Sequence, residues 1–241
     1  MKKSFIYNCL PLLFAAMATF SFTACGGGDG DDTDYAAIAA MQGALGGGTG
    51  GSMLDSRIVD LGLSVKWASC NVGATQPWEY GGYYAWGETE EKSEYSWNTY
   101  KYGQNLEMPA KYCTTDNKRT LEPGDDVATV KWGGTWRMPT TPEQYELINN
   151  CTWTWTAING VSGYRVTGPN GNSIFLPAAG YIDGTEVYEQ SSCGYYWSRA
   201  LYSINNYFFG NAYILIYSGS DYYSHSSMER NTGLSVRPVC P

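Results

Sequence analysis

Gly194-Tyr195-Tyr196-Trp197-Ser198 and Gly233-Leu234-Ser235-Val236-Arg237-Pro238-Val239-Cys240 begin and end a C-terminal stretch around which we expect the rest of the chain to fold. Both segments have the aromatic, β-branched and apolar composition of buried strands. The residues between them differ, because tyrosine, asparagine and serine predominate there. These residue types provide contact area and adaptable hydrogen bonds at a low cost in side-chain entropy, as binding surfaces require. The stretch therefore predicts a rigid frame that presents an aromatic-rich recognition face.

The predicted recognition face takes its side chains from this middle segment. Its tyrosines have polar neighbours and no hydrophobic period, which indicates exposure rather than core packing. The single histidine of the chain, His225, lies among serines, where a surface contact fits better than a catalytic role. We expect a ligand to contact Tyr202, Asn205, Asn206, Tyr207, Phe209, Ile214, Ile216, Ser218, Asp221, Tyr222, Tyr223, His225 and Arg230.

Outward from this stretch, the chain has the pattern of one α+β domain with few helices, short antiparallel strands and long loops. Thr140 is followed by Pro142 and Glu143, which is the capping box of a helix that begins there and ends near Asn149-Asn150. Residues 89–128 are polar and rich in turns, which predicts a long loop region. Composition is uniform from residue 58 to residue 241, so we expect a single domain. Strands are expected at 58–63, 65–68, 152–156, 164–167, 173–176 and 213–217.

The first 24 residues have the pattern of a signal peptide. Lys2 and Lys3 precede an apolar run that is too short for a stable membrane span, and small residues follow it. Thr23-Ala24-Cys25 resembles a bacterial lipobox, which implies cleavage before Cys25 and acylation of that residue. An ordinary signal peptide with a chance cysteine is the alternative. Acylation would hold the protein on a membrane through lipid chains alone.

Residues 25–57 are glycine-rich and acidic, and they cannot bury an apolar face, so we expect a flexible tether. The acidic run after Cys25 resembles the export signal that sends lipoproteins of Bacteroidota to the outer face of the outer membrane. A solvated spacer is the alternative reading. On the first reading, the protein is an outer membrane lipoprotein exposed at the cell surface.

Charge and cysteine content limit the classes of partner. The chain has a net charge of −8, and loss of residues 1–24 removes two lysines and no acid. Such a surface repels phosphate backbones, so nucleic acid is not an expected partner. Disulfides are expected outside the cytoplasm. An odd number of cysteines remains in the domain, and we expect Cys193 to stay unpaired, while the pairing of the others is open. These cysteines are Cys70, Cys113, Cys151, Cys193 and Cys240.

Three segments in this order resemble the Fibrobacter succinogenes major paralogous domain. They are Trp136-Arg137-Met138-Pro139-Thr140, Gly194-Tyr195-Tyr196-Trp197-Ser198 and Gly233-Leu234-Ser235-Val236-Arg237-Pro238-Val239. That family is related to the C-type-lectin-like fold and to formylglycine-generating enzymes. The resemblance spans nearly all of residues 58–241. It implies a C-type-lectin-like domain whose chain ends lie together and whose long loops carry recognition.

The same fold serves the variable proteins of diversity-generating retroelements. Their C-terminal stretch is rewritten at chosen codons and ends in a strand like Leu234 to Val239. Much of the segment from Leu201 to Thr232 consists of residues that an asparagine codon reaches through changes of its adenines. The segment therefore suits such a protein. Ordinary enrichment of tyrosine and serine on a binding face would give the same composition.

Two enzyme readings are weaker. The oxidase chemistry of formylglycine-generating enzymes needs two closely spaced cysteines that hold copper, whereas Cys193 and Cys240 are far apart in the sequence. A glycosidase needs two opposed carboxylates, and the acidic residues Glu88, Glu90, Glu91 and Glu94 share one polar run. We therefore expect no catalysis.

A calcium site is a further candidate. Glu122, Asp125 and Asp126 offer hard oxygen ligands in one turn, as calcium prefers. Glu122-Pro123-Gly124 matches the sugar-binding loop of C-type lectins only in part, and carboxylates in turns more commonly accept backbone N–H bonds. The expected function is capture of a protein or glycan ligand on another cell, a phage or the host. A calcium-independent lectin is the first alternative, and an oxidase is the second.

Overall fold

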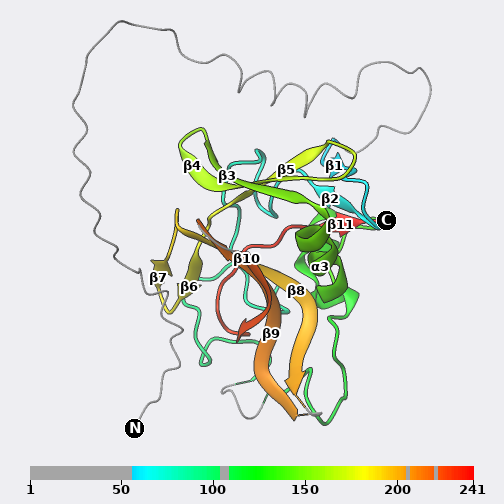
Figure 1. Cartoon of the computed structure of the whole chain (residues 1–241). Coiled ribbons are helices and arrows are strands. Elements are labelled where there is room, and N and C mark those ends of the chain that lie inside the picture. Colours follow the sequence, from blue (N-terminus) through cyan, green and yellow to red (C-terminus); the bar gives the residue numbers. More distant parts are fainter. Residues whose placement is uncertain (1–55, 104–108, 205–206, 220–221) are drawn as a thin grey trace, which may run out of the picture.

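A computed structural model describes residues 56–241 except 104–108, 205–206 and 220–221. Its regular structure is mostly antiparallel β-sheet, with few helices in those ranges (Figure 1). The helical elements are η1 (Pro123–Asp125), α2 (Val127–Trp132) and α3 (Thr141–Asn150). The strands are β1 (Ile58–Val59), β2 (Lys66–Ala68), β3 (Thr152–Ile158), β4 (Val161–Thr167), β5 (Ser173–Pro177), β6 (Tyr181–Asp183), β7 (Glu186–Tyr188), β8 (Cys193–Ile204), β9 (Tyr207–Ser218), β10 (Tyr222–Glu229) and β11 (Val239–Cys240).

The two ends of the described chain meet in one small sheet of order β1-β2-β11. Trp67 of β2 pairs with Val59 on one side and with Val239 on the other. Both Trp67 and Val239 are buried, so the closure is held by core packing as well as by backbone hydrogen bonds. Figure 1 shows the C-terminus beside β1 and β2. The expected meeting of the chain ends is therefore present.

α3 begins where the capping box predicts. The Thr140 side chain accepts a hydrogen bond from the Glu143 N–H, and the Glu143 carboxylate accepts one from the Thr140 N–H. The helix ends because Cys151 is extended and β3 follows directly. Leu147 and Ile148 of α3 pack into the core with β4 and β5. The expected helix is confirmed.

β8, β9 and β10 form an antiparallel sheet in which β9 is central. Side chains alternate between the two faces of a strand, and the two faces of β9 meet different clusters. Ala212 and Ile214 pack with Trp86 and Trp197 in one core. Leu215 and Tyr217 pack with α3, β4 and β5 in a second core. The sheet therefore lies between two cores for part of its length, and in Figure 1 β8 and β9 extend away from β3, β4 and β5.

Most expected strands are confirmed. Each strand range predicted from the sequence contains an observed strand, although β1, β2 and the C-terminal strand β11 are shorter than expected. Trp67, Trp86 and Trp197 are fully buried. The predicted loop region is less regular than the rest, but it contains η1 and the start of α2, which the sequence pattern did not indicate. The Asp126 side chain caps α2 by accepting hydrogen bonds from the N–H groups of Ala128 and Thr129.

Candidate functional site

The central sheet leaves part of one face outside the second core. On β9, Asn211 and Tyr213 share the face of Leu215 and Tyr217, because every second residue of a strand points the same way. Leu215 and Tyr217 are almost fully buried, whereas Asn211 and Tyr213 are half-buried. The second core therefore covers this face of β9 at Leu215, and the face is partly exposed at Tyr213.

Neighbouring strands add to this surface. Ser227 of β10 lies directly opposite Tyr213, so both side chains are on the same face. Tyr202 of β8 follows the core residue Leu201 and contacts the Tyr213 ring edge-on, with centroids 5.0 Å apart. The Asn211 side-chain amide donates to the Ser227 hydroxyl at 3.4 Å. We call Tyr202, Asn211, Tyr213 and Ser227 the distal face.

The opposite face of the same strands is part of the first core. Leu201, Ala212 and Ile214 are buried there, and Met228 of β10 packs against them. One face thus anchors the sheet, and the distal face presents two phenol rings, an amide and a hydroxyl. This set provides aromatic contact area and adaptable hydrogen bonding without being needed to fill either core.

Two residues predicted to contact ligand are buried instead. Ile214 is 1% exposed and belongs to the first core, since it is on the anchored face of β9. Arg230 is 0% exposed, and its Nη1 donates to the carbonyls of Lys111 and Tyr112 at 3.1 Å and 3.2 Å. Its guanidinium lies 5.6 Å from the Trp86 ring centroid and 5.5 Å from that of Tyr100. Both assignments are wrong, and both residues belong to the frame.

The remaining predicted residues divide into three groups. Tyr202 is half-buried and lies on the distal face. Ile216 is half-buried and packs against the first core, and Ser218 is half-buried at the end of β9. In the third group, either the whole residue or its side chain lies outside the described part of the structure. This group contains Asn205, Asn206, Tyr207, Phe209, Asp221, Tyr222, Tyr223 and His225. Cys25 also lies outside the described residues.

Sequence reasoning missed Tyr213, which was placed in the expected strand at 213–217 but not among the ligand contacts. The alternation from Asn211 to Ile214 contains the missing signal, because a polar or amphipathic residue alternates there with Ala212 and Ile214. The rest of the distal face depends on which strands pair, and this information is not local in the sequence.

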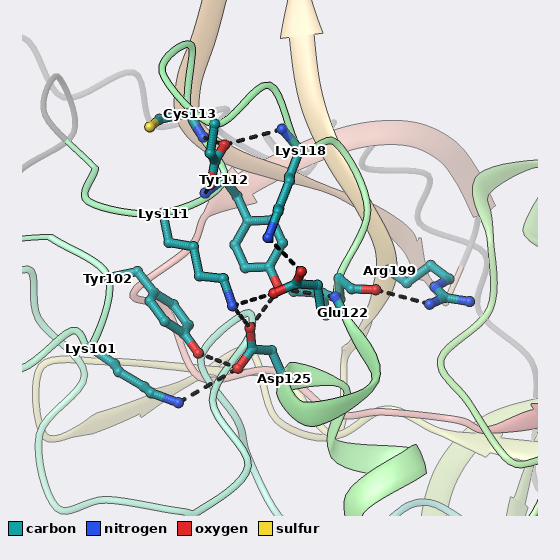
Figure 2. A network of polar contacts seen from close by, with 11 residues as sticks. Lys101, Tyr102, Lys111, Tyr112, Cys113, Lys118, Glu122, Asp125 and Arg199 are labelled. Carbon is teal, nitrogen blue, oxygen red and sulfur yellow. Dashed lines mark hydrogen bonds and ion pairs between the residues drawn. The ribbon is translucent and has the colours of Figure 1, made fainter.

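A network of polar contacts, separate from the distal face, fixes the loop region beside this sheet (Figure 2). Asp125 of η1 accepts hydrogen bonds from the phenols of Tyr102 and Tyr112, the latter at 2.5 Å, and from Lys111 Nζ at 2.5 Å. Lys111 also pairs with Glu122 at 2.6 Å, and Lys118 pairs with the other oxygen of Glu122. The network joins the segments on both sides of residues 104–108 to η1.

The charges of this network follow from its contacts. Burial alone would raise the pKa of Asp125, but the hydrogen bonds from Lys111, Tyr102 and Tyr112 outweigh it and hold the pKa at about 2. Burial and the bond to Asp125 raise the pKa of Tyr112 to about 12. The hydrogen bonds to Asp125 and Glu122 raise the pKa of Lys111. At neutral pH the cluster therefore holds an ionised carboxylate, protonated phenols and a protonated lysine.

Two of the three calcium candidates converge on the ammonium group of Lys111, and the third is engaged elsewhere. Asp125 and Glu122 are engaged with the lysines and tyrosines of the network. Asp126 is fully buried and accepts hydrogen bonds from the N–H groups of Ala128, Thr129 and Met138. Burial raises the pKa of Asp126 despite these donors. In the described ranges, no group of three or more His, Cys, Asp or Glu residues is arranged to hold a metal ion.

The carboxylates considered for glycosidase chemistry have separate partners. Glu88 pairs with Lys92 at 2.9 Å, and Glu90 pairs with Lys131 at 2.6 Å. Glu91 accepts a hydrogen bond from the Tyr83 N–H at 3.1 Å, and Glu94 accepts one from the Ser96 hydroxyl at 2.8 Å. Each of these four carboxylates is thus engaged with an internal donor.

The cysteines are distributed over different elements. Cys193 is opposite Ser218 in the central sheet, whereas Cys240 is opposite Lys66 in the sheet of the chain ends. Both are buried. Cys70, Cys113 and Cys151 are free thiols, so the expected disulfides are not formed among the described residues. Burial raises the pKa of Cys151 to about 11, and burial also raises that of Cys70.

Comparison with known proteins gives no relative for this arrangement. No family model, curated protein or solved structure matches the chain. Within the described part of the chain, no helix is long and apolar enough to cross a membrane.

Proposed function

We propose that the protein is a surface lipoprotein whose single C-type-lectin-like domain binds a protein or glycan ligand through the distal face and the adjoining β8–β10 segments, without transforming it. The ligand is presented by another cell, a phage or the host. The paired chain ends, the scarcity of helices in the described ranges and the long loop region support this fold assignment.

One observation carries the proposal. The same three strands have one face in the first core and another that leaves the second core with Tyr202 and Tyr213 half-buried. A tyrosine with a partly exposed ring can gain contact area when a ligand covers it, and its hydroxyl can bond at the edge of the contact. The anchored face fixes the position of both rings, so little order has to be gained on binding.

A calcium-independent lectin is the second candidate. The Tyr202–Tyr213 pair with the adjacent Asn211 amide would suit a sugar ring, which combines an apolar face with hydroxyl groups. The engagement of Glu122, Asp125 and Asp126 with internal donors favours recognition that does not pass through calcium.

Two arrays separate the candidates. Labelled full-length protein is applied to a glycan array and to an array of purified extracellular protein domains, with calcium and with a chelator. Binding to one array identifies the ligand class. The Tyr202→Ala/Tyr213→Ala variant is expected to lose affinity by about tenfold or more, because central aromatic contacts dominate binding energy.

Val130→Ala is the matched control, since this change also shortens an exposed apolar side chain, but on α2. Its affinity should equal that of the original protein. Retained binding by the distal-face variant, with an unchanged urea midpoint, would refute the binding surface.

The membrane anchor has its own test. Cells that express the chain are grown with an alkyne-bearing fatty acid, and incorporation into the protein is measured after click labelling. The original chain should be labelled, and Cys25→Ser should not be. Equal labelling of both would contradict lipidation at Cys25, and protease treatment of intact cells reports surface exposure.

A further inference from the structure

A separate surface lies on the hairpin of β6 and β7. Val187 and Tyr188 are 47% and 44% exposed, and they are two of the three large hydrophobic residues with high exposure in the described ranges. All three residues of β7 are exposed. Tyr188 stacks on Tyr181 of β6, with ring centroids 5.3 Å apart and an interplanar angle of 21°. This platform is distinct from the distal face.

The two edges of the hairpin differ. On β6, the Ile182 N–H donates to the Gly233 carbonyl at 2.9 Å, and the Gly233 N–H donates to the Ile182 carbonyl at 2.9 Å. On β7, no strand or bridge of the described chain pairs with the outer side. Thus β6 connects the hairpin to the domain, and β7 is its open edge.

The backbone of Val187 faces outward from this edge. Ile182 and Val187 are directly opposite each other. Because Ile182 makes both of its backbone hydrogen bonds on its outer side, this pair is the non-hydrogen-bonded kind, in which the N–H and C=O of both residues point away from each other. Val187 therefore offers one donor and one acceptor to an additional strand.

The charge of the hairpin indicates what such a strand would carry. Asp183 lies directly opposite Glu186, and like charges in that position destabilise a sheet. Glu189 follows β7, and no Lys or Arg occurs between residues 166 and 198. No ion pair of the described chain includes these three carboxylates. A cation from outside would relieve this repulsion, and the exposed Tyr188 ring can also accept it.

We propose that β7 binds an extended basic peptide, which adds a strand through the Val187 backbone and places a Lys or Arg beside Asp183, Glu186 and Tyr188. Charge selects against two other occupants. A second copy would bring the same carboxylates, and residues 26–55 of the chain contain five aspartates and no Lys or Arg. The proposal is independent of the function of the distal face.

The test uses full-length protein and a fluorescein-labelled Thr-Lys-Val-Lys-Val-Lys-Thr peptide in fluorescence anisotropy. The peptide should bind, and an otherwise equal peptide with Glu in place of each Lys should not. Raising the salt concentration should weaken binding. Val187→Pro removes the outward N–H, and affinity should fall about tenfold. Val187→Thr keeps this N–H and serves as the matched control.

Further measurements distinguish strand addition from non-specific charge attraction and from misfolding. Asp183→Asn/Glu186→Gln should abolish the preference for the basic peptide. Near-UV circular dichroism of Val187→Pro should match that of the original protein, and if it does not, the charge variant alone decides. Failure to bind the basic peptide, or equal binding of the acidic one, would overturn the proposal. Slow hydrogen exchange of the Val187 amide without peptide would also overturn it, since a second copy or residues 26–55 would then already cover β7.

Discussion

Arg230 shows how a single residue can join the frame to the loop region. A buried cation is costly unless its donors and its charge are satisfied. Here Nη1 donates to the backbone carbonyls of Lys111 and Tyr112. The guanidinium lies close to the Trp86 and Tyr100 rings. Nε and Nη2 have no hydrogen-bond acceptor among the described residues, so the aromatic rings are the compensating partners seen there.

Replacement of Arg230 by Met tests this role. Met retains much of the side-chain volume but leaves the Lys111 and Tyr112 carbonyls without their donor, so the free energy of unfolding should fall by about 2 kcal/mol. Urea denaturation followed by tryptophan fluorescence measures the change. Arg119→Met, at an exposed position, is the matched control. Equal midpoints for the two variants would contradict the role of Arg230.

Asp125 makes the stability of the fold depend on pH. Its pKa is about 2 in the folded protein and about 3.9 in an unfolded chain. The unfolded state therefore binds the proton more readily, so the stabilisation is complete above about pH 4 and is lost as the pH falls toward 2.

Asp125→Asn should lower the free energy of unfolding at pH 7 by roughly 2 kcal/mol, and the difference should shrink below about pH 4. Tyr112→Phe removes one donor to Asp125 and so raises the folded-state pKa toward that of the unfolded chain, which should make the acid-dependent loss of stability smaller and complete at a higher pH. Urea midpoints measured from pH 7 to pH 2 check both variants. A difference in stability between the original protein and the Asp125→Asn variant that stays constant over this range would refute the assignment.

At the scale of elements, α3 is the clearest case of local control. The capping box places its first residue, and the packing of Leu147 and Ile148 fixes its face. Thr140→Ala removes the side-chain oxygen that accepts from the Glu143 N–H, and should cost about 1 kcal/mol. Thermal unfolding measures this change against Thr154→Ala, which alters an exposed threonine of β3. A smaller loss for Thr140→Ala than for the control would contradict the importance of the cap.

The features that were predicted correctly are those encoded by residues close together in the sequence, and the features that were missed depend on long-range contacts. Caps, turns and period-two strands are encoded within a few residues, and α3 and β3 to β5 were predicted accordingly. The burial of Ile214 and Arg230 depends on partners from other strands and from the loop region. Composition alone assigned both to a binding surface, because it does not show which face of β9 or which end of β10 meets the core. The Asp125 network lies within the predicted loop region, and its Tyr102, Lys111 and Tyr112 contacts depend on how that loop folds back, which composition does not show.

The whole domain is closed by its last residues. Arg237 is 1% exposed and donates to Asn71, Ala68 and Phe175 at 2.9 Å, 3.0 Å and 2.8 Å, so the C-terminal segment bonds to the start of the domain and to β5. β11 follows, and Val239 exchanges backbone hydrogen bonds with Arg137 at 3.0 Å and 2.9 Å. Because these contacts join three regions, their loss should affect the domain as a unit rather than fray one end.

Deletion of Val239–Pro241 tests this closure. It removes two buried side chains and the pairing of β11 with β2, a loss of about 3–5 kcal/mol in a domain whose total stability is typically about 5–15 kcal/mol. We expect a large fall in melting temperature in the far-UV and near-UV circular dichroism signals together. Deletion of the exposed Pro241 alone is the control and should change little. If the longer deletion left the melting temperature unchanged, or melted only the sheet of the chain ends, closure of the domain by its C-terminal strand would be contradicted. The central sheet would then be held in place without that strand.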